Sequence, residues 1–145
     1  MQAQMLLPAA VLVLWSLVML LWTAFTRFGA FARMGIKLDK TPPGGRGVNL
    51  EGVLPDKVNW KSHNYTHLME QPTIFYPTVM ILALLGADRI DVWLSWSYVI
   101  IRVAHSVWQA TVNKVGFRFG LFIMSTGCLV VLAVRALVAT LNGGV

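Results

Sequence analysis

Apolar positions fall into four long stretches separated by short polar segments. No charged side chain occurs from Met1 to Thr26, and a bilayer core needs about 20 apolar residues of helix. The pattern predicts membrane spans over residues 5–26, 66–87, 92–113 and 116–141. We therefore expect an all-α integral membrane protein, a single domain of residues 1–145 folded as an antiparallel four-helix bundle.

The segments between the spans differ in length. The first, Arg27–Tyr65, is the longest, and its middle, Thr41–Gly47 (TPPGGRG), has the composition of turns. Lys114 and Val115 leave almost no loop between the last two spans, so those helices should be antiparallel neighbours. Within the second span, Pro72 and Pro77 favour a kink, which serves either packing or the opening of a cavity just after Glu70.

Composition supports a membrane protein over the other classes. Hydrophobic residues make up 57% of the 145 residues and charged residues 12%, against roughly 45–50% and 25% in soluble domains. This content also excludes disorder, and the single cysteine, Cys128, excludes a disulfide scaffold. No nucleic-acid partner is expected, because the basic residues do not interleave with aromatic ones along a soluble element.

The distribution of the net charge of +6 predicts an orientation. Lys and Arg collect in cytoplasmic loops of membrane proteins. The first loop holds seven basic residues, whereas the second connection holds only Arg89. We expect the long first loop to be cytoplasmic and both termini to lie on the opposite side of the membrane.

Polar residues inside the spans fall on single helical faces. One face carries Arg102, His105 and Gln109, and the other carries His63, His67 and Glu70. Charged groups in membrane helices are costly and usually face the bundle interior, so the two faces should meet there. One interpretation is that Glu70 and Arg102 simply neutralise each other. The other is a cationic cavity with one carboxylate, suited to a zwitterionic ligand, because a guanidinium grips carboxylates and Glu70 can hold an ammonium group.

A metal site is a further interpretation of the same residues. His63 and His67 are four residues apart and could share a metal ion. This spacing is common by chance, and neither Cys nor Asp joins it. We expect no metal.

Two sequence motifs resemble one family of membrane proteins. The run Arg102–Ser106 (RVAHS), with Arg118 following Arg102 by 16 residues, is similar to the third-span signature of the MAPEG superfamily, the membrane-associated proteins in eicosanoid and glutathione metabolism. His67–Glu70 (HLME), with Pro72 and an aromatic pair just after it, resembles that family's second-span motif. The likeness covers essentially the whole chain and extends to bacterial members and to the glutathione transferase and prostaglandin E synthase branches.

The resemblance implies a homotrimer that binds glutathione between subunits near the cytoplasmic face. It implies that Arg118 is catalytic and stabilises the glutathione thiolate, while a lipophilic small molecule arrives from the membrane lipid. The residues expected to bind glutathione are Glu70, Arg102, His105, His67 and Gln109.

Two functions remain open at this point. Arg118, Arg102 and Glu70 favour a glutathione-dependent transferase or isomerase acting on lipophilic electrophiles. The alternative is a non-catalytic lipid- or partner-binding membrane protein of the same fold. It is favoured by Gln109, which stands where many family members have Tyr, and by Thr66, which stands where a basic residue often precedes the second-span motif.

Overall fold

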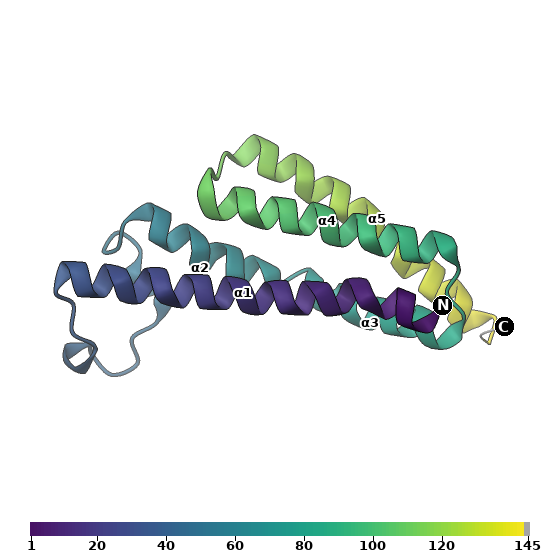
Figure 1. The fold of residues 1–145 in the computed structure, drawn as a ribbon, viewed down its shortest axis with the longest axis horizontal. Coiled ribbons are helices and arrows are strands. Elements are labelled where there is room, and N and C mark those ends of the chain that lie inside the picture. The colour runs from purple at the N-terminus through teal and green to yellow at the C-terminus, as the bar shows by residue number, and fades with distance from the viewer. Residues whose placement is uncertain (144–145) are drawn as a thin grey trace.

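The structure is a computed structural model that describes residues 1–143. Its helices run antiparallel along one long axis, and both termini lie at the same end of the bundle (Figure 1). The all-α prediction is confirmed. The helices are α1 (Gln2–Met34), α2 (Asp56–Leu68), α3 (Pro72–Leu85), α4 (Arg89–Thr111) and α5 (Val115–Leu141).

Helix α1 continues well beyond the predicted end of the first span. It ends at Gly35, which adopts the left-handed conformation (φ 68°) and whose N–H donates to the carbonyl of Phe31. Residues 27–34 remain helical because most of them, including two Arg, two Ala and one Met, are good helix formers, and the single Gly29 does not end the helix. The first loop is consequently shorter than predicted, covering residues 35–55, with two short 3₁₀ turns at Leu38–Lys40 and Gly47–Leu50.

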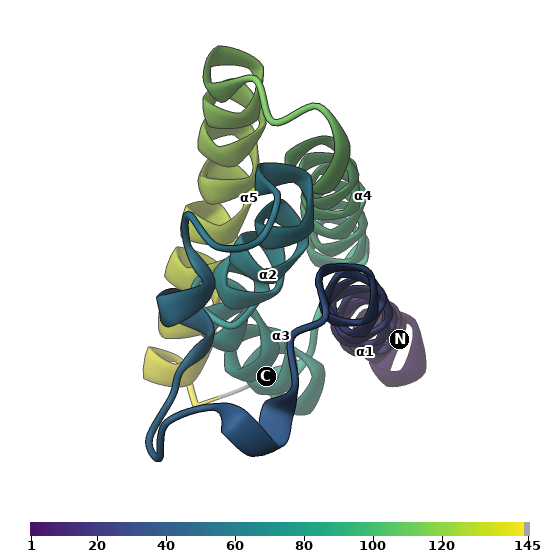
Figure 2. The same ribbon diagram turned by 90° about the vertical axis from the view of Figure 1, so that its left-hand side faces the viewer.

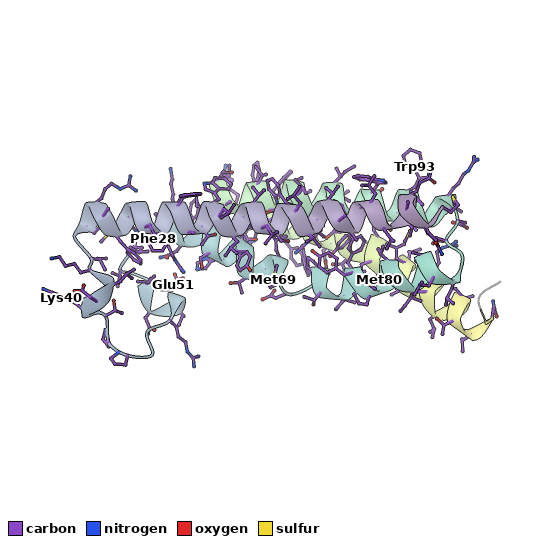
Figure 3. All side chains as sticks on the ribbon, turned by 60° about the horizontal axis from the view of Figure 1, so that its bottom comes forward. Phe28, Lys40, Glu51, Met69, Met80 and Trp93 are labelled. Carbon is purple, nitrogen blue, oxygen red and sulfur yellow. The ribbon has the colours of Figure 1, made fainter. Side chains whose placement is uncertain are left out.

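The helical stretch that contains most of the second predicted span, residues 66–87, is longer than that span and is divided in two. The helical stretch begins at Asp56 and is interrupted at residues 69–71, so that α2 and α3 form its two halves. Pro72 begins α3, where its missing N–H costs no helical hydrogen bond. Pro77 lies inside α3 without ending it. We therefore attribute the break to Pro72. It includes Glu70 and lies at the labelled Met69 (Figure 3).

Three helical stretches within residues 1–143 are long and apolar enough to cross a membrane: Gln2–Met34, Asp56–Leu85 and Val115–Leu141. Helix α4 has 23 residues, about 35 Å of helix, which is sufficient length for a span. Its hydropathy is lower because polar side chains occupy its buried face. That α4 crosses the membrane stays a prediction.

The four helical stretches of the bundle, α1, α2–α3, α4 and α5, share one apolar core. Seen end-on, the α2–α3 stretch lies beside α1, α4 and α5, and its remaining side is not covered by a helix (Figure 2). Helix α4 packs most extensively against α5, and α1 packs against α2, α3 and α4. Phe75 of α3 stacks on Tyr98 of α4 with ring centroids 4.3 Å apart. Large apolar side chains on the outer faces of α1 and α5 remain exposed, as expected for surfaces that contact lipid or other subunits.

The turn between α3 and α4 is held by charges. Asp88 caps α4 by accepting from the backbone N–H groups of Ile90 and Asp91, and the Asp91 carboxylate accepts from the N–H of Asp88. Arg135 of α5 donates to both carboxylates, with 2.6 Å between Nη2 and Oδ2 of Asp88. This triad closes the end of the bundle that carries the termini.

Candidate functional site

One face of α4 is polar and buried along the whole helix. Its side chains point into the bundle between α1, α2 and α5. The polar residues of this face are Asp91, Ser95, Arg102, His105, Ser106 and Gln109, all at most 4% exposed. The 3.6-residue repeat of the helix places them together, as the sequence predicts for Arg102, His105 and Gln109.

Arg102 is completely buried and contacts the end of α2. Its Nη2 donates to Nδ1 of His67 at 3.0 Å and to the carbonyl oxygen of His67 at 3.2 Å. Because a guanidinium can only donate, Nδ1 of His67 must be the unprotonated ring nitrogen. The two predicted polar faces therefore meet through Arg102 and His67.

Several polar atoms of this face have no partner among residues 1–143. They are Nε and Nη1 of Arg102, Nε2 of His105 and Oε1 of Gln109. A buried polar atom without a hydrogen bond costs about 1–3 kcal/mol, and a charged one costs more. The cluster is therefore incomplete within the described chain, and its unsatisfied groups are suited to an anionic or polar ligand.

A hollow of about 230 Å³ opens beside this cluster. It lies between the end of α2, the last turns of α4 and the first turns of α5. Its walls are formed by His67, His105, Val115, Arg118, Phe119 and Phe122. The ring of His67 lies 4.9 Å from that of His105 and 5.6 Å from that of Phe122. The hollow thus combines cationic and aromatic walls.

Arg118 enters this hollow from the first turn of α5. Its Nη1 donates to Oδ1 of Asn113 at 2.6 Å. Asn113 adopts positive φ (55°), a conformation that Asn tolerates better than most residues. The turn between α4 and α5 therefore positions the guanidinium, with its other N–H groups available.

Three of the predicted site residues, Glu70, Gln109 and Arg102, do not line the hollow. Glu70 lies in the break between α2 and α3, where its side chain is exposed and makes no ion pair with Arg102. Gln109 is buried, two helical turns beyond Arg102, but does not line the hollow. The structure brings Arg118, His105 and His67 together at the hollow, and Nη2 of Arg102 contacts His67.

His63 also departs from the predicted polar face. It is exposed and pairs with Glu51 of the first loop. No group of three or more His, Cys, Asp or Glu side chains within residues 1–143 lies close enough to hold a metal ion.

Two contacts near the site are not evident from the sequence pattern. The Ser106 hydroxyl accepts from Nδ2 of Asn64 at 2.7 Å and from Nε1 of Trp15 at 2.9 Å. They tie α1, α2 and α4 together one helical turn from Arg102. Asn64 precedes His67 by three residues and shares its side of α2, which is the one signal that could have identified it.

Comparison with known proteins identifies the family. The model of the MAPEG family matches residues 5–138, nearly the whole chain. The chain belongs to the MAPEG family. This MAPEG protein is therefore a helical membrane protein of the superfamily of eicosanoid and glutathione metabolism. No curated protein and no solved structure matches it.

The donor set of this MAPEG protein fits glutathione. Glutathione carries two carboxylates, an ammonium group and a thiol. Arg102 and His105 have buried nitrogen atoms without partners in the described chain, and Arg118 offers further N–H groups at the hollow. These N–H groups can donate hydrogen bonds to a carboxylate or a thiolate. The carboxylate of Glu70 is available to bind an ammonium group.

Proposed function

We propose that this MAPEG protein is a transferase that joins glutathione to lipophilic electrophiles. The observation that carries the proposal is the hollow in which Arg118 lies beside His105, next to the unsatisfied Arg102. A ligand that brings carboxylates to these cations would complete the hydrogen bonds that the chain leaves open.

Within this proposal, the chain's residues have distinct roles. Arg102 and His105 bind carboxylate groups of glutathione through their free nitrogen atoms, and Gln109 contributes an amide along the same face. His67 orients Arg102 by accepting from Nη2. Glu70 binds the ammonium group.

Arg118 promotes ionisation of the thiol. A guanidinium beside a thiol favours its charged form, and the first turn of α5 adds partial positive charge. The thiolate sulfur then attacks the electrophilic carbon, a C–S bond forms, and the leaving group departs with its electron pair while the thiol proton goes to solvent. Phe119 is 61% exposed at the hollow and offers an apolar approach for a substrate from the lipid.

The test is a glutathione titration of detergent-purified protein by calorimetry, followed by conjugation to chlorodinitrobenzene. The wild-type protein should bind glutathione and show thiolate absorbance in the ultraviolet. Arg118→Ala should remove a charge-assisted contact worth about 1.5–3 kcal/mol, which lowers the rate about 10- to 150-fold. Lys114→Ala is the matched control, because Lys114 is an exposed cation of the same turn outside the hollow. Equal activity of Arg118→Ala and wild type would refute the catalytic role.

The non-catalytic alternative rests on Gln109. Its side chain lies outside the hollow and has no hydroxyl to donate to a thiolate. If the wild-type protein fails to bind glutathione at millimolar concentration, the chain binds a lipid or protein partner without catalysis. If Gln109→Tyr creates conjugating activity in a protein that already binds glutathione, that alternative is favoured for the natural sequence.

The same proposal includes a homotrimer. Glu70 is exposed beside the site, which is the placement expected for a residue that completes a site shared with another subunit. The number three comes from the family resemblance. Native mass spectrometry in several mild detergents should give trimers, and monomers under all conditions would contradict the assembly.

We also propose that the first loop is cytoplasmic. The loop and the α4–α5 turn lie at one end of the bundle and both termini at the other (Figure 1), so one labelled position reports the orientation. In a Cys128→Ser background, Gly45→Cys should react with a membrane-impermeant thiol reagent only from the cytoplasmic side. Reaction only from the other side would reverse the orientation.

A further inference from the structure

The contacts of the His67 ring fix which of its nitrogen atoms carries the proton. Nη2 of Arg102 lies 3.0 Å from Nδ1 of His67 and 3.2 Å from the carbonyl oxygen of the same residue. A guanidinium only donates, so Nδ1 accepts and carries no proton. The ring is therefore neutral, because a proton on Nδ1 would set two N–H groups against each other. Its single N–H is on Nε2.

Nε2 of His67 is available to a ligand. Unlike Nε2 of His105, it is not fully buried, and it makes no hydrogen bond among residues 1–143. His67 lines the hollow of about 230 Å³, whereas Arg102 does not. Arg102 covers the Nδ1 edge of the ring, which leaves Nε2 as the only polar ring atom that His67 can offer to the hollow.

Aromatic neighbours hold the orientation of this ring. The ring of Phe122 meets it edge-on, with centroids 5.6 Å apart and an angle of 77° between the planes. The ring of His105 lies 4.9 Å away at 50°. Together with the contact to Arg102, these neighbours fix the direction of the Nε2–H bond before a ligand arrives. A donor held in this way stabilises a developing negative charge without reorganisation.

The charged groups around the hollow favour a negative charge inside it. Arg118 of α5 is in its walls, and none of the described wall residues is acidic. Arg102 of α4 contacts His67 from outside the hollow, and the Glu70 carboxylate is exposed in the break after α2. The other titratable wall residue is His105. An anionic sulfur in the hollow would therefore face the Arg118 guanidinium from α5 and an imidazole N–H from α2.

We propose that Nε2–H of His67 donates a hydrogen bond to the sulfur of glutathione, which makes His67 a second catalytic residue beside Arg118. The inference rests on the proposed function, in which the sulfur lies in this hollow. A donor to the charged form lowers the pKa of the thiol. The thiol proton goes to solvent, the sulfur keeps its electron pair and attacks the electrophile, and the His67 proton stays on Nε2 throughout.

The first experiment measures the pKa of bound glutathione from its thiolate absorbance in detergent-purified protein. His67→Asn puts an amide oxygen where Nδ1 lies, so it still accepts from Arg102 but has no group at the Nε2 position. We expect glutathione affinity within about twofold of wild type. The pKa of the bound thiol should rise by about one unit, which means about tenfold less thiolate below that pKa. The conjugation rate should fall about tenfold at neutral pH and approach that of wild type at alkaline pH.

His67→Gln is the complementary variant. Its longer amide reaches the Nε2 position and can donate there, but it leaves the Nδ1 position empty. This variant should keep the pKa of the bound thiol near that of wild type, whatever its effect on Arg102. The reverse pattern, a raised pKa in His67→Gln and a wild-type pKa in His67→Asn, would assign the effect to the orientation of Arg102 and overturn the role of Nε2.

His63→Asn is the matched control. It makes the same substitution one helical turn earlier on α2, at an exposed histidine that pairs with Glu51 outside the hollow. The pKa of the bound thiol and the conjugation rate should stay at the wild-type values.

The outcomes separate this role from the proposed function. If Arg118→Ala raises the pKa of the bound thiol and His67→Asn does not, His67 is not a sulfur donor and the proposed function stands. If the wild-type protein binds no glutathione, the proposed function itself is refuted. If both His67 variants unfold, nitrogen NMR of isotope-labelled wild-type protein decides. We expect a neutral ring protonated at Nε2, whose Nε2 resonance shifts when glutathione binds, and a ring protonated at Nδ1 would overturn the role of His67.

Discussion

Two arginines of the helical bundle are placed in opposite electrostatic surroundings. Arg135, near the end that carries the termini, donates to the carboxylates of both Asp88 and Asp91. Arg102 is completely buried and has as partners only a ring nitrogen and a carbonyl oxygen of His67. One cation is neutralised by its own chain, whereas the other makes no ion pair among residues 1–143.

This difference separates a structural role from a functional one. Removing one member of a buried, hydrogen-bonded ion pair lowers the free energy of unfolding, because the remaining charge is left unpaired. A buried cation with unused N–H groups carries a cost that a ligand can remove. Arg135 therefore stabilises one end of the bundle, whereas Arg102 has N–H groups that can bind an anion.

The largest effect is expected on removing the Arg135 cation. Arg135→Met leaves Asp91, which is 2% exposed, without its countercharge. We expect the free energy of unfolding to fall by about 3 kcal/mol, the lower end for a broken buried pair because Arg135 is partly exposed. The measurement is reversible unfolding in detergent. Arg89→Met is the control, since Arg89 is exposed at the same turn and forms no ion pair within residues 1–143. A stability unchanged by Arg135→Met would contradict the structural role.

Arg102→Met should weaken ligand binding while leaving stability nearly unchanged, in contrast to Arg135→Met. It removes a buried guanidinium with unsatisfied N–H groups and inserts an apolar side chain, so the free energy of unfolding should stay within about 1 kcal/mol of wild type or rise. Glutathione binding should weaken about 10- to 150-fold through loss of a charge-assisted contact. Calorimetric titration and unfolding of the same preparation test both expectations. A protein that is destabilised as strongly as Arg135→Met would make Arg102 structural.

Much of the fold is predictable from the chain because a bilayer requires long uncharged stretches, and these are visible in the sequence. The break before Pro72 also has a local cause, the missing N–H of proline. The ends of α1 and α2 are less visible, because both helices continue through polar residues where the apolar pattern has stopped. The loop was therefore predicted as longer than residues 35–55.

The site is predictable only within single helices. The helical repeat alone brings Arg102, His105 and Gln109 to one face. Whether His67 or Glu70 meets Arg102 depends on how α2 ends and on its register against α4, which no local pattern encodes. The turn at residues 69–71 leaves Glu70 exposed, while His67 remains on the last turn of α2. The Arg135 triad was missed for the same reason, since it joins residues more than 40 positions apart.

A smaller effect is expected from giving Arg102 a carboxylate of its own. His67→Glu places an acidic side chain on the helix position that already contacts Nη2 of Arg102. The new ion pair should stabilise the protein by about 1 kcal/mol and weaken glutathione binding, because the guanidinium is then neutralised internally as Arg135 is. His67→Gln is the control that changes the partner without adding charge. If His67→Glu leaves both glutathione affinity and stability unchanged, Arg102 does not act as an anion site.

The smallest effect is expected from acid at the Arg135 end. The backbone N–H of Asp91 and the Arg135 guanidinium lower the pKa of the Asp88 carboxyl below its usual range. A carboxyl whose pKa is lowered in the folded protein contributes stability above its unfolded pKa of about 3.9, and this contribution is lost as the pH falls through the folded value. Asp88 is about half exposed, so the contribution should be at most about 1 kcal/mol.

Asp88→Asn isolates this charge, because an asparagine side chain still caps α4. Unfolding measured from about pH 6 down to about pH 3 should show a shallower loss of stability in Asp88→Asn than in wild type. Arg102→Met should keep the wild-type slope, since no carboxylate pairs with Arg102 among residues 1–143. Identical slopes for wild type and Asp88→Asn would mean that the Asp91 pair alone neutralises Arg135. A flattened slope in Arg102→Met would mean that Glu70 already serves as its countercharge, and the contrast between the two arginines would be lost.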